Sequence, residues 1–234
     1  MSITDDIERV RERVRVAARR AGRSADEIAV MAVSKTVPPE RIRDAYDVGL
    51  RLFGENRVQE FAGKAAPLSS LHGAAWHMIG HLQTNKAAKA AELFHAVDSL
   101  DSIKLADKLD AVARNIGKKL DILIEVNVGG EAAKSGLAPD SRELEDLLLT
   151  FPRLESLALR GLMTIPPFSD DPLDSRPFFR RLRELRDAIA RRKLPAVGMD
   201  MLSMGMSHDF EVAIEEDSTC VRVGTAIFGE RVKA

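Results

Sequence analysis

The chain has 234 residues, of which 45% are hydrophobic and 30% charged, so it has the composition of a globular protein and a length that suits one large domain. The formal net charge is -1 and no apolar run approaches the roughly 20 residues of a membrane span, which argues against a nucleic-acid-binding surface and a transmembrane helix. The single cysteine, Cys220, excludes an internal disulfide and favours a cytoplasmic location, and the acidic start at residues 1–6 lacks the pattern of a secretory signal.

The predicted elements begin with a helix that no strand precedes. Thr4 is expected to be its N-cap, apolar residues follow at helical spacing from Ile7, and Gly22 ends it. Eight short β-rich runs then cover residues 28–33, 51–53, 75–79, 94–97, 120–128, 157–163, 200–202 and 220–223. Helical stretches between them cover residues 39–48, 57–65, 84–91, 102–116, 141–150, 177–191 and 209–215.

This alternation implies parallel strands joined by helical crossovers. Because eight such units fit one domain, the sequence predicts a single (β/α)8 TIM barrel with an extra N-terminal helix over residues 1–234. An open doubly wound sheet is the alternative. In a barrel of this kind the functional residues lie at the C-terminal ends of the strands and in the loops that follow them.

Polar residues follow the first three predicted strands. Lys35 comes directly after an apolar run, where burial would lower its pKa and suit it to act as a base or to form an imine; the alternative is a lysine that reaches out of the rim. Asn56 presents donors and an acceptor toward the mouth, or caps the helix at Arg57. His77 and His81 are four residues apart, but His77 falls within a strand, so we predict no metal site and expect His81 to line the pocket.

The later strands add a carboxylate and two small-residue loops. Glu125 alternates with apolar residues and needs a partner, for which Arg160 and Lys35 are candidates. Barrels often bind phosphate in the loops after strands 7 and 8, at the start of a short extra helix. The residues at those places that fit this role are Ser203, Gly205, Gly224 and Thr225, although two ordinary turns would look the same.

Arg222 lies inside the last predicted strand, between two valines. A buried guanidinium needs an acceptor, which would be a carboxylate of the barrel or a ring nitrogen of a bound cofactor. An imine-forming lysine, a phosphate cup and an arginine together match the aldehyde, the phosphate and the pyridine nitrogen of pyridoxal 5′-phosphate (PLP).

Several runs resemble the pyridoxal phosphate homeostasis protein family in order along nearly the whole chain. These runs are residues 32–36, 53–56, 76–86, 202–207 and 221–229. The resemblance implies a fold similar to the barrel domain of alanine racemase, an imine on Lys35 and an Arg222 that faces the pyridine nitrogen. It also implies that Ser203, Gly224 and Thr225 hold the phosphate. Members of this family are described as PLP carriers or regulators of cofactor and amino-acid balance without an established reaction.

The residues also disfavour catalysis. An arginine at the pyridine nitrogen keeps it unprotonated and makes the ring a weaker electron sink. Two-base racemisation needs a second base, which alanine racemases take from a tyrosine of a separate domain; we expect no such domain here, and the only tyrosine, Tyr46, falls in a predicted outer helix. We therefore predict a monomeric PLP carrier, with apo PLP-dependent enzymes as possible recipients. The alternatives are a weak amino-acid racemase and a PLP-free barrel isomerase.

Overall fold

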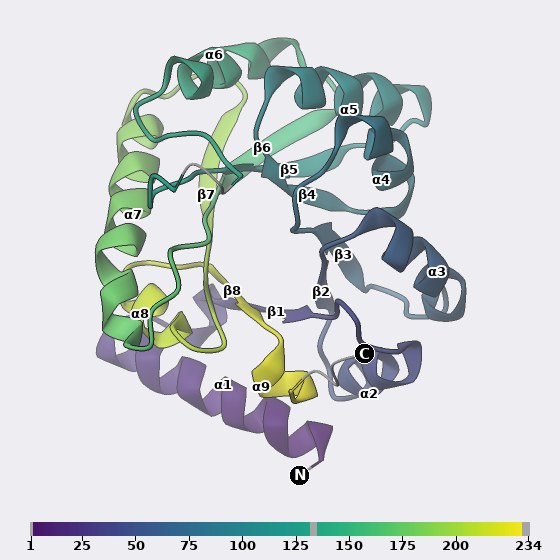
Figure 1. Cartoon of the computed structure of the whole chain (residues 1–234), viewed down its shortest axis with the longest axis vertical. Helices are drawn as coiled ribbons and strands as arrows, with labels where there is room; N and C mark the ends of the chain where they lie inside the picture. Colours follow the sequence, from purple (N-terminus) through teal and green to yellow (C-terminus); the bar gives the residue numbers. More distant parts are fainter. Residues whose placement is uncertain (1, 132–134, 231–234) are drawn as a thin grey trace.

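The computed structural model describes residues 2–131 and 135–230, and its eight parallel strands close into a barrel in chain order (Figure 1). The strands are β1 (Ala29–Val33), β2 (Leu52–Glu55), β3 (Ala75–Met78), β4 (Ala96–Leu100), β5 (Leu120–Glu125), β6 (Leu157–Met163), β7 (Val197–Met206) and β8 (Cys220–Val223). The barrel closes between β1 and β8, where Met31 pairs with Arg222. The predicted TIM barrel is confirmed and the open sheet is wrong.

Helices surround the barrel (Figure 1). The α-helices are α1 (Ile3–Arg20), α2 (Pro39–Asp47), α3 (Val58–Leu68), α4 (Ala87–Leu93), α5 (Ile103–Asn115), α6 (Arg142–Thr150), α7 (Arg176–Arg191), α8 (Phe210–Glu215) and α9 (Thr225–Phe228). Each predicted helix is present, with ends that differ by a few residues. Within the described ranges, no helix combines the length and the apolar character needed to cross a membrane.

The extra N-terminal helix, α1, lies outside the barrel against α8 and α9 (Figure 1). Its buried side chains recur at helical spacing: Ile3, Ile7, Val10, Val14, Ala17 and Ala18. Its N-cap is Ser2 rather than the predicted Thr4. The Ser2 hydroxyl accepts a hydrogen bond from the Asp5 backbone N–H, and the Asp5 carboxylate accepts one from the Ser2 N–H, so two N–H groups at the helix start are satisfied.

Three strands, β2, β4 and β7, extend beyond their predicted bounds. β7 covers ten residues instead of the predicted three, because Gly198 and Gly205 resemble turn residues in the sequence but lie within the strand. β4 begins and ends later than predicted, because its polar Asp98 and Ser99 are fully buried and break the expected apolar run. The longer β7 changes which of its residues reach the mouth of the barrel.

The main core lies between the strands and the helices. Its largest aromatic group joins β2, β3, α3 and the residue that follows α4: the rings of Phe53 and Trp76 stack at 4.8 Å, Phe61 lies 4.7 Å from Trp76, and Phe94 lies 5.0 Å from Phe61. A smaller buried cluster contains Met31, Ile79 and Cys220. Because Cys220 and Arg222 are two residues apart on β8, they share a face of the strand, and this cluster lies beneath the mouth.

Gly161 on β6 permits the close approach of β7. A Cβ atom there would lie 1.9 Å from the carbonyl oxygen of Met201, which is backbone and cannot rotate away. We therefore expect Gly161→Ala to lower the free energy of unfolding by about 3 kcal/mol. As a matched control, Gly63 lies within α3 with open space around it, so Gly63→Ala should raise stability by about 0.5–1 kcal/mol. Urea unfolding of both variants checks this; equal effects would contradict the close packing of β6 on β7.

Candidate cofactor-binding site

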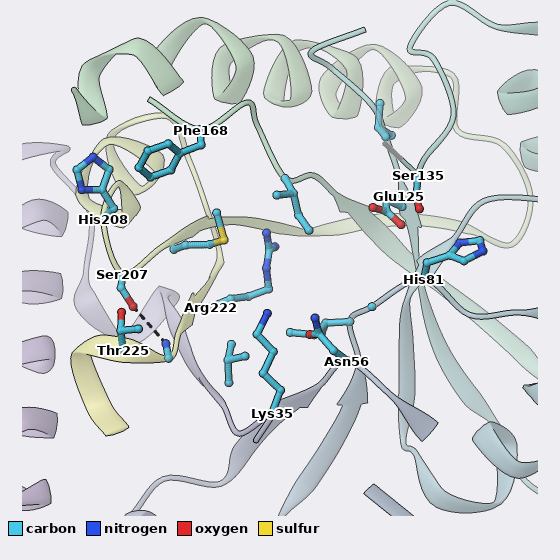
Figure 2. A pocket seen from close by; sticks show the side chains of 17 residues that line it. Lys35, Asn56, His81, Glu125, Ser135, Phe168, Ser207, His208, Arg222 and Thr225 are labelled. Atoms are coloured by element: carbon cyan, nitrogen blue, oxygen red, sulfur yellow. Dashed lines mark hydrogen bonds between the residues drawn. The ribbon is translucent and has the colours of Figure 1, made fainter. Parts of the chain in front are cut away.

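A cavity of about 550 Å³ opens at the C-terminal ends of the strands (Figure 2). This volume is within the range of pockets that bind small molecules. Six of the eight residues that the sequence nominated line it: Lys35, Asn56, His81, Arg222, Gly224 and Thr225. They come from the ends of β1, β2, β3 and β8, so the barrel collects residues that are far apart in sequence.

Lys35 is half-buried in the turn that follows β1. Figure 2 shows its side chain extending into the middle of the cavity, between Arg222 and Asn56. The opposite orientation, a lysine that points out of the rim into solvent, is therefore not the one observed. Its amine lies where a ligand in the cavity would meet it.

Asn56 follows β2 and contributes its side chain to the cavity wall. It does not cap α3, because the N-cap of that helix is Arg57 and the cap has no side-chain hydrogen bond. The backbone of Asn56 packs against Gly80, where a Cβ atom would lie 2.4 Å from the Asn56 carbonyl oxygen. Glycine at position 80 therefore allows the loops after β2 and β3 to meet in the cavity.

The cup formed by the loops after β7 and β8 has Ser207 at its centre. The Ser207 hydroxyl accepts hydrogen bonds from the backbone N–H groups of Gly224 (3.2 Å) and Ala226 (3.4 Å), and Thr225 lies beside it (Figure 2). Two hydroxyl groups and a turn of backbone N–H groups therefore gather at one end of the cavity. Such a group of donors suits an anion with several oxygens.

Ser203 and Gly205, which the sequence nominated for this cup, do not line the cavity. Both lie within β7, which continues to Met206, so Ser207 is the serine that reaches the mouth. Ser203 is fully buried and accepts a hydrogen bond from Arg222. Gly205 has φ +90°, and a Cβ atom there would lie 2.5 Å from the Cβ of Ala213, so this glycine lets α8 pack on β7.

Arg222 is buried, and its guanidinium donates to three oxygens. Nη1 donates to the carbonyl (2.6 Å) and the hydroxyl (2.8 Å) of Ser203, and Nη2 donates to the carbonyl of Thr164 (2.7 Å). Its hydrogen-bond acceptors are thus carbonyl and hydroxyl oxygens, and not a barrel carboxylate, which was one of the two acceptors that the sequence left open. These bonds fix the plane of the guanidinium at the cavity wall, and they use three of its five N–H groups.

Glu125 ends β5 and faces the cavity, although it is 7% exposed. The expected pair with Arg160 is not formed, since Arg160 pairs with Asp121 at 2.8 Å near the start of β5. Within the described residues, the buried Glu125 Oε2 atom has no hydrogen-bond partner. Burial raises the pKa of Glu125 to about 7; Asp101 adds to the rise, whereas Arg222 and His81 oppose it.

The two histidines in and just after the third predicted strand contact different carboxylates. His81 lines the cavity and its Nδ1 lies 3.1 Å from an oxygen of Asp101. His77 does not line the cavity; its Nδ1 lies 3.0 Å from Asp98. Burial opposes the charged form of His77, but Asp98 outweighs it and raises the pKa.

The protonation of Glu125 predicts a pH-dependent stability. Its folded pKa of about 7 lies above the ordinary 4.5, so the folded state holds more protons between these values and the stability that Glu125 contributes falls as pH rises through them. Glu125→Gln keeps the shape without the charge. In urea unfolding without ligand, the variant should match the wild type near pH 4.5 and exceed it by about 3 kcal/mol at pH 8. The same difference at both pH values would contradict this.

Sequence reasoning missed several lining residues. These are Val33, Ile79, Gly80, Val126, Ser135, Ile165, Phe168, Met206, Ser207 and His208. Phe168 is 81% exposed and its ring centroid lies 6.0 Å from that of His208 at the cavity mouth. Ser207 could have been found, because it closes the run of residues 203–207 that follows the predicted seventh strand. Phe168 carried no signal, since it lies in an irregular loop between Met163 and α7.

The sequence is similar to known proteins over nearly its whole length. The family model of the alanine racemase N-terminal domain matches residues 6–232. The pyridoxal phosphate homeostasis protein of Aquifex aeolicus (strain VF5) is 48% identical over 232 residues, which cover 99% of both chains. That of Pseudomonas aeruginosa is 43% identical over 230 residues, covering 98% of this chain and 96% of the other.

Two solved structures have the same barrel fold as this chain. PipY of Synechococcus elongatus PCC7942 with PLP bound superposes with a TM-score of 0.82 at 34% identity, covering 97% of this chain and 100% of that one. Alanine racemase of Clostridium difficile 630 gives a TM-score of 0.75 at 13% identity over 98% of this chain and 58% of its own, a likeness of fold alone. The chain therefore belongs to the alanine racemase N-terminal domain family, in the group of the pyridoxal phosphate homeostasis proteins.

Proposed function

We propose that this chain binds PLP in the cavity as an imine with Lys35 and acts as a carrier of the cofactor in the cytoplasm. The observation that carries the proposal is the arrangement of Lys35, the Ser207–Thr225 cup and Arg222 around one cavity of about 550 Å³. The bound PLP in the solved structure of PipY, a relative of 34% identity, supports the same ligand here.

Each wall of the cavity fits one part of the cofactor. The Lys35 amine attacks the aldehyde carbon, a C=N bond replaces the C=O bond, and one water molecule leaves. The hydroxyls of Ser207 and Thr225 and the backbone N–H groups that follow β8 hold the phosphate. Arg222 directs an N–H group to the pyridine nitrogen, and Ser203 holds Arg222 in place. Asn56 and His81 contribute polar atoms along the rest of the ring.

The test is an absorbance spectrum of the purified protein with added PLP, before and after borohydride reduction, followed by mass mapping of the labelled peptide. We expect a band near the edge of the visible range and a reduced adduct on Lys35. The absence of both would remove the imine and leave a phosphate-binding barrel of unknown chemistry.

A carrier and an enzyme differ in what they do to an amino acid. Tyr46 lies on α2, where its hydroxyl donates to the His72 carbonyl at 2.7 Å and the Arg51 guanidinium lies over its ring, so it supplies no base to the cavity. We propose that the bound PLP passes to apo PLP-dependent enzymes and thereby influences amino-acid balance. Incubation of the PLP-loaded protein with L-alanine in heavy water separates the two functions: deuterium exchange at the α-carbon well above that of free PLP would favour a weak racemase.

A further inference from the structure

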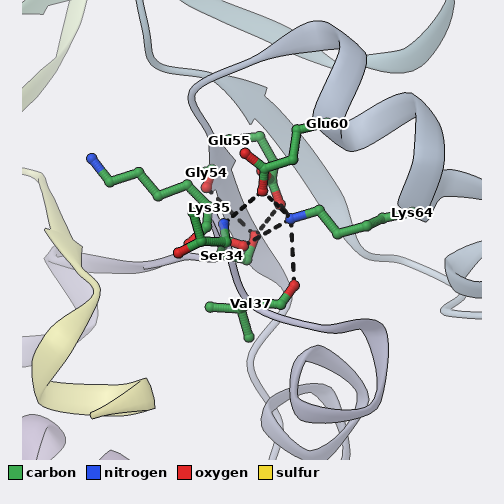
Figure 3. A network of polar contacts seen from close by, with 8 residues as sticks. Ser34, Lys35, Val37, Gly54, Glu55, Glu60 and Lys64 are labelled. Carbon is green, nitrogen blue, oxygen red and sulfur yellow. Dashed lines mark hydrogen bonds and ion pairs between the residues drawn. The ribbon is translucent and has the colours of Figure 1, made fainter. Parts of the chain in front are cut away.

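A buried ion network on the outer side of β1 and β2 holds the turn that carries Lys35 (Figure 3). Its centre is Lys64 of α3, which is 8% exposed. The Lys64 Nζ atom lies 2.9 Å from Glu55 and 2.8 Å from Glu60. It also donates to the carbonyl oxygens of Ser34 (3.0 Å) and Val37 (3.4 Å), which flank Lys35.

The two carboxylates contact the same turn. Glu60 accepts a hydrogen bond from the Thr36 backbone N–H at 2.6 Å, and Glu55 accepts one from the Ser34 hydroxyl at 2.7 Å. Burial opposes ionisation of Glu60, but the hydrogen bonds from Lys64 and Thr36 outweigh it and hold the pKa below its ordinary value. Glu60 is therefore a carboxylate at neutral pH. The residues on both sides of Lys35 are bonded to members of one charged network: Thr36 to Glu60, and Ser34 to Glu55 and Lys64.

The turn needs this support because Thr36 has an unfavourable backbone conformation. Its φ is +61°, a left-handed value that β-branched residues rarely adopt. Such a conformation persists only where surrounding contacts impose it, and it often occurs at functional sites. In Figure 3 the Lys35 side chain leaves the turn on the side away from Lys64, so the strained backbone and the direction of Lys35 are fixed together.

We propose that Glu60 and Lys64 are positioning residues for Lys35: by holding Thr36 in its left-handed conformation they aim the Lys35 amine into the cavity, ready to form the imine. The inference rests on the proposed function, because its main test is the dissociation constant of PLP. Glu60 and Lys64 do not themselves line the cavity.

The test uses Glu60→Leu, which removes the acceptor of the Thr36 N–H from a partly exposed position on α3. One hydrogen bond to a charged group is lost, so the dissociation constant of PLP should rise about tenfold. Glu60→Gln retains an acceptor oxygen and should have a smaller effect. The control is Glu92→Leu, which breaks the exposed Lys89–Glu92 pair on the neighbouring helix and should leave the constant unchanged.

A suppressor distinguishes positioning from general support of the fold. Glycine adopts φ +61° without strain, so Thr36→Gly in the Glu60→Leu background should recover most of the lost affinity. A purely structural role predicts that Glu60→Leu lowers the unfolding midpoint, leaves the PLP dissociation constant unchanged and gains nothing from Thr36→Gly. That result would overturn the inference.

A second readout does not depend on PLP. Reductive methylation with formaldehyde and cyanoborohydride, mapped by mass spectrometry, reports how Lys35 is presented, with the exposed Lys104 as internal reference. We expect the ratio of the Lys35 rate to the Lys104 rate to change severalfold in Glu60→Leu and to return toward wild type with Thr36→Gly. If the wild type forms no imine, the proposed function fails, and this ratio alone decides the inference: an unchanged ratio overturns it.

Discussion

Lys35→Ala is expected to abolish the imine absorption band of the PLP-loaded protein and to weaken PLP binding by about 100-fold or more. In the proposed binding mode the covalent link would be lost, whereas the Ser207–Thr225 cup and Arg222 would still contact the phosphate and the ring. Binding should therefore become weak and fully reversible, with no adduct on borohydride reduction. Absorbance titration and mass mapping of the reduced protein measure both effects.

The same variant should keep its fold. Lys35 belongs to a turn and its side chain extends into the cavity, so truncation removes little packing from the core (Figure 2). We expect an unfolding midpoint close to wild type in the absence of PLP. Lys104→Ala, at an exposed position on α5, is the matched control and should leave the band intact. A retained band, or loss of cooperative unfolding in Lys35→Ala, would contradict the assignment of Lys35 as the anchor.

The barrel and most of the cavity could be predicted because both follow from local patterns. Alternating strands and helices require parallel strands, and parallel strands in a closed barrel bring their C-terminal ends together. Polar residues directly after the apolar runs, such as Lys35 and His81, therefore had to meet near one mouth. Arg222 was identifiable because a charged residue between two valines of a strand must be buried and bonded.

The errors arose where a strand end or a partner depends on tertiary contacts. Ser203 was placed in the phosphate cup because β7 was expected to end near residue 202, whereas it continues to Met206 and brings Ser207 to the mouth. Arg160 was a candidate partner of Glu125, but it pairs with Asp121, which lies near the start of β5, whereas Glu125 ends that strand. Strand pairing and register, which decide these contacts, have no local signal.

The network around Thr36 was invisible for a related reason. Glu55, Glu60 and Lys64 resemble an ordinary charged strand end and helix surface in the sequence. Their role becomes apparent only when α3 packs beside β1 and Lys64 reaches the carbonyls of Ser34 and Val37. A left-handed threonine is equally hidden, since nothing in the sequence requires it.

Arg222→Met should lower the free energy of unfolding by about 4 kcal/mol, the largest stability loss that we predict. The variant keeps most of the side-chain length but leaves two buried acceptors without their donor, the hydroxyl of Ser203 and the carbonyl of Thr164. The carbonyl of Ser203 also loses Arg222 but still accepts from the Thr164 N–H at 3.2 Å. Each unsatisfied group costs about 1–3 kcal/mol. The matched control is Arg160→Met, which breaks an exposed ion pair and should change stability by less than about 1 kcal/mol. Urea unfolding of the two variants gives the comparison.

A second measurement separates the charge of Arg222 from its hydrogen bonds. Arg222 opposes the rise in the pKa of Glu125, so its removal should shift the pKa of Glu125 above about 7, as followed by carbon NMR of the carboxyl group. Arg222→Lys keeps a positive charge but cannot reproduce the forked geometry, so it should restore the Glu125 titration more fully than the stability. If Arg222→Met costs no more than Arg160→Met, the guanidinium is not what fixes the Ser203 and Thr164 oxygens. If the pKa of Glu125 does not change in Arg222→Met, the charge of Arg222 does not act across the cavity. The proposed place of Arg222 beside the pyridine nitrogen then loses its electrostatic support.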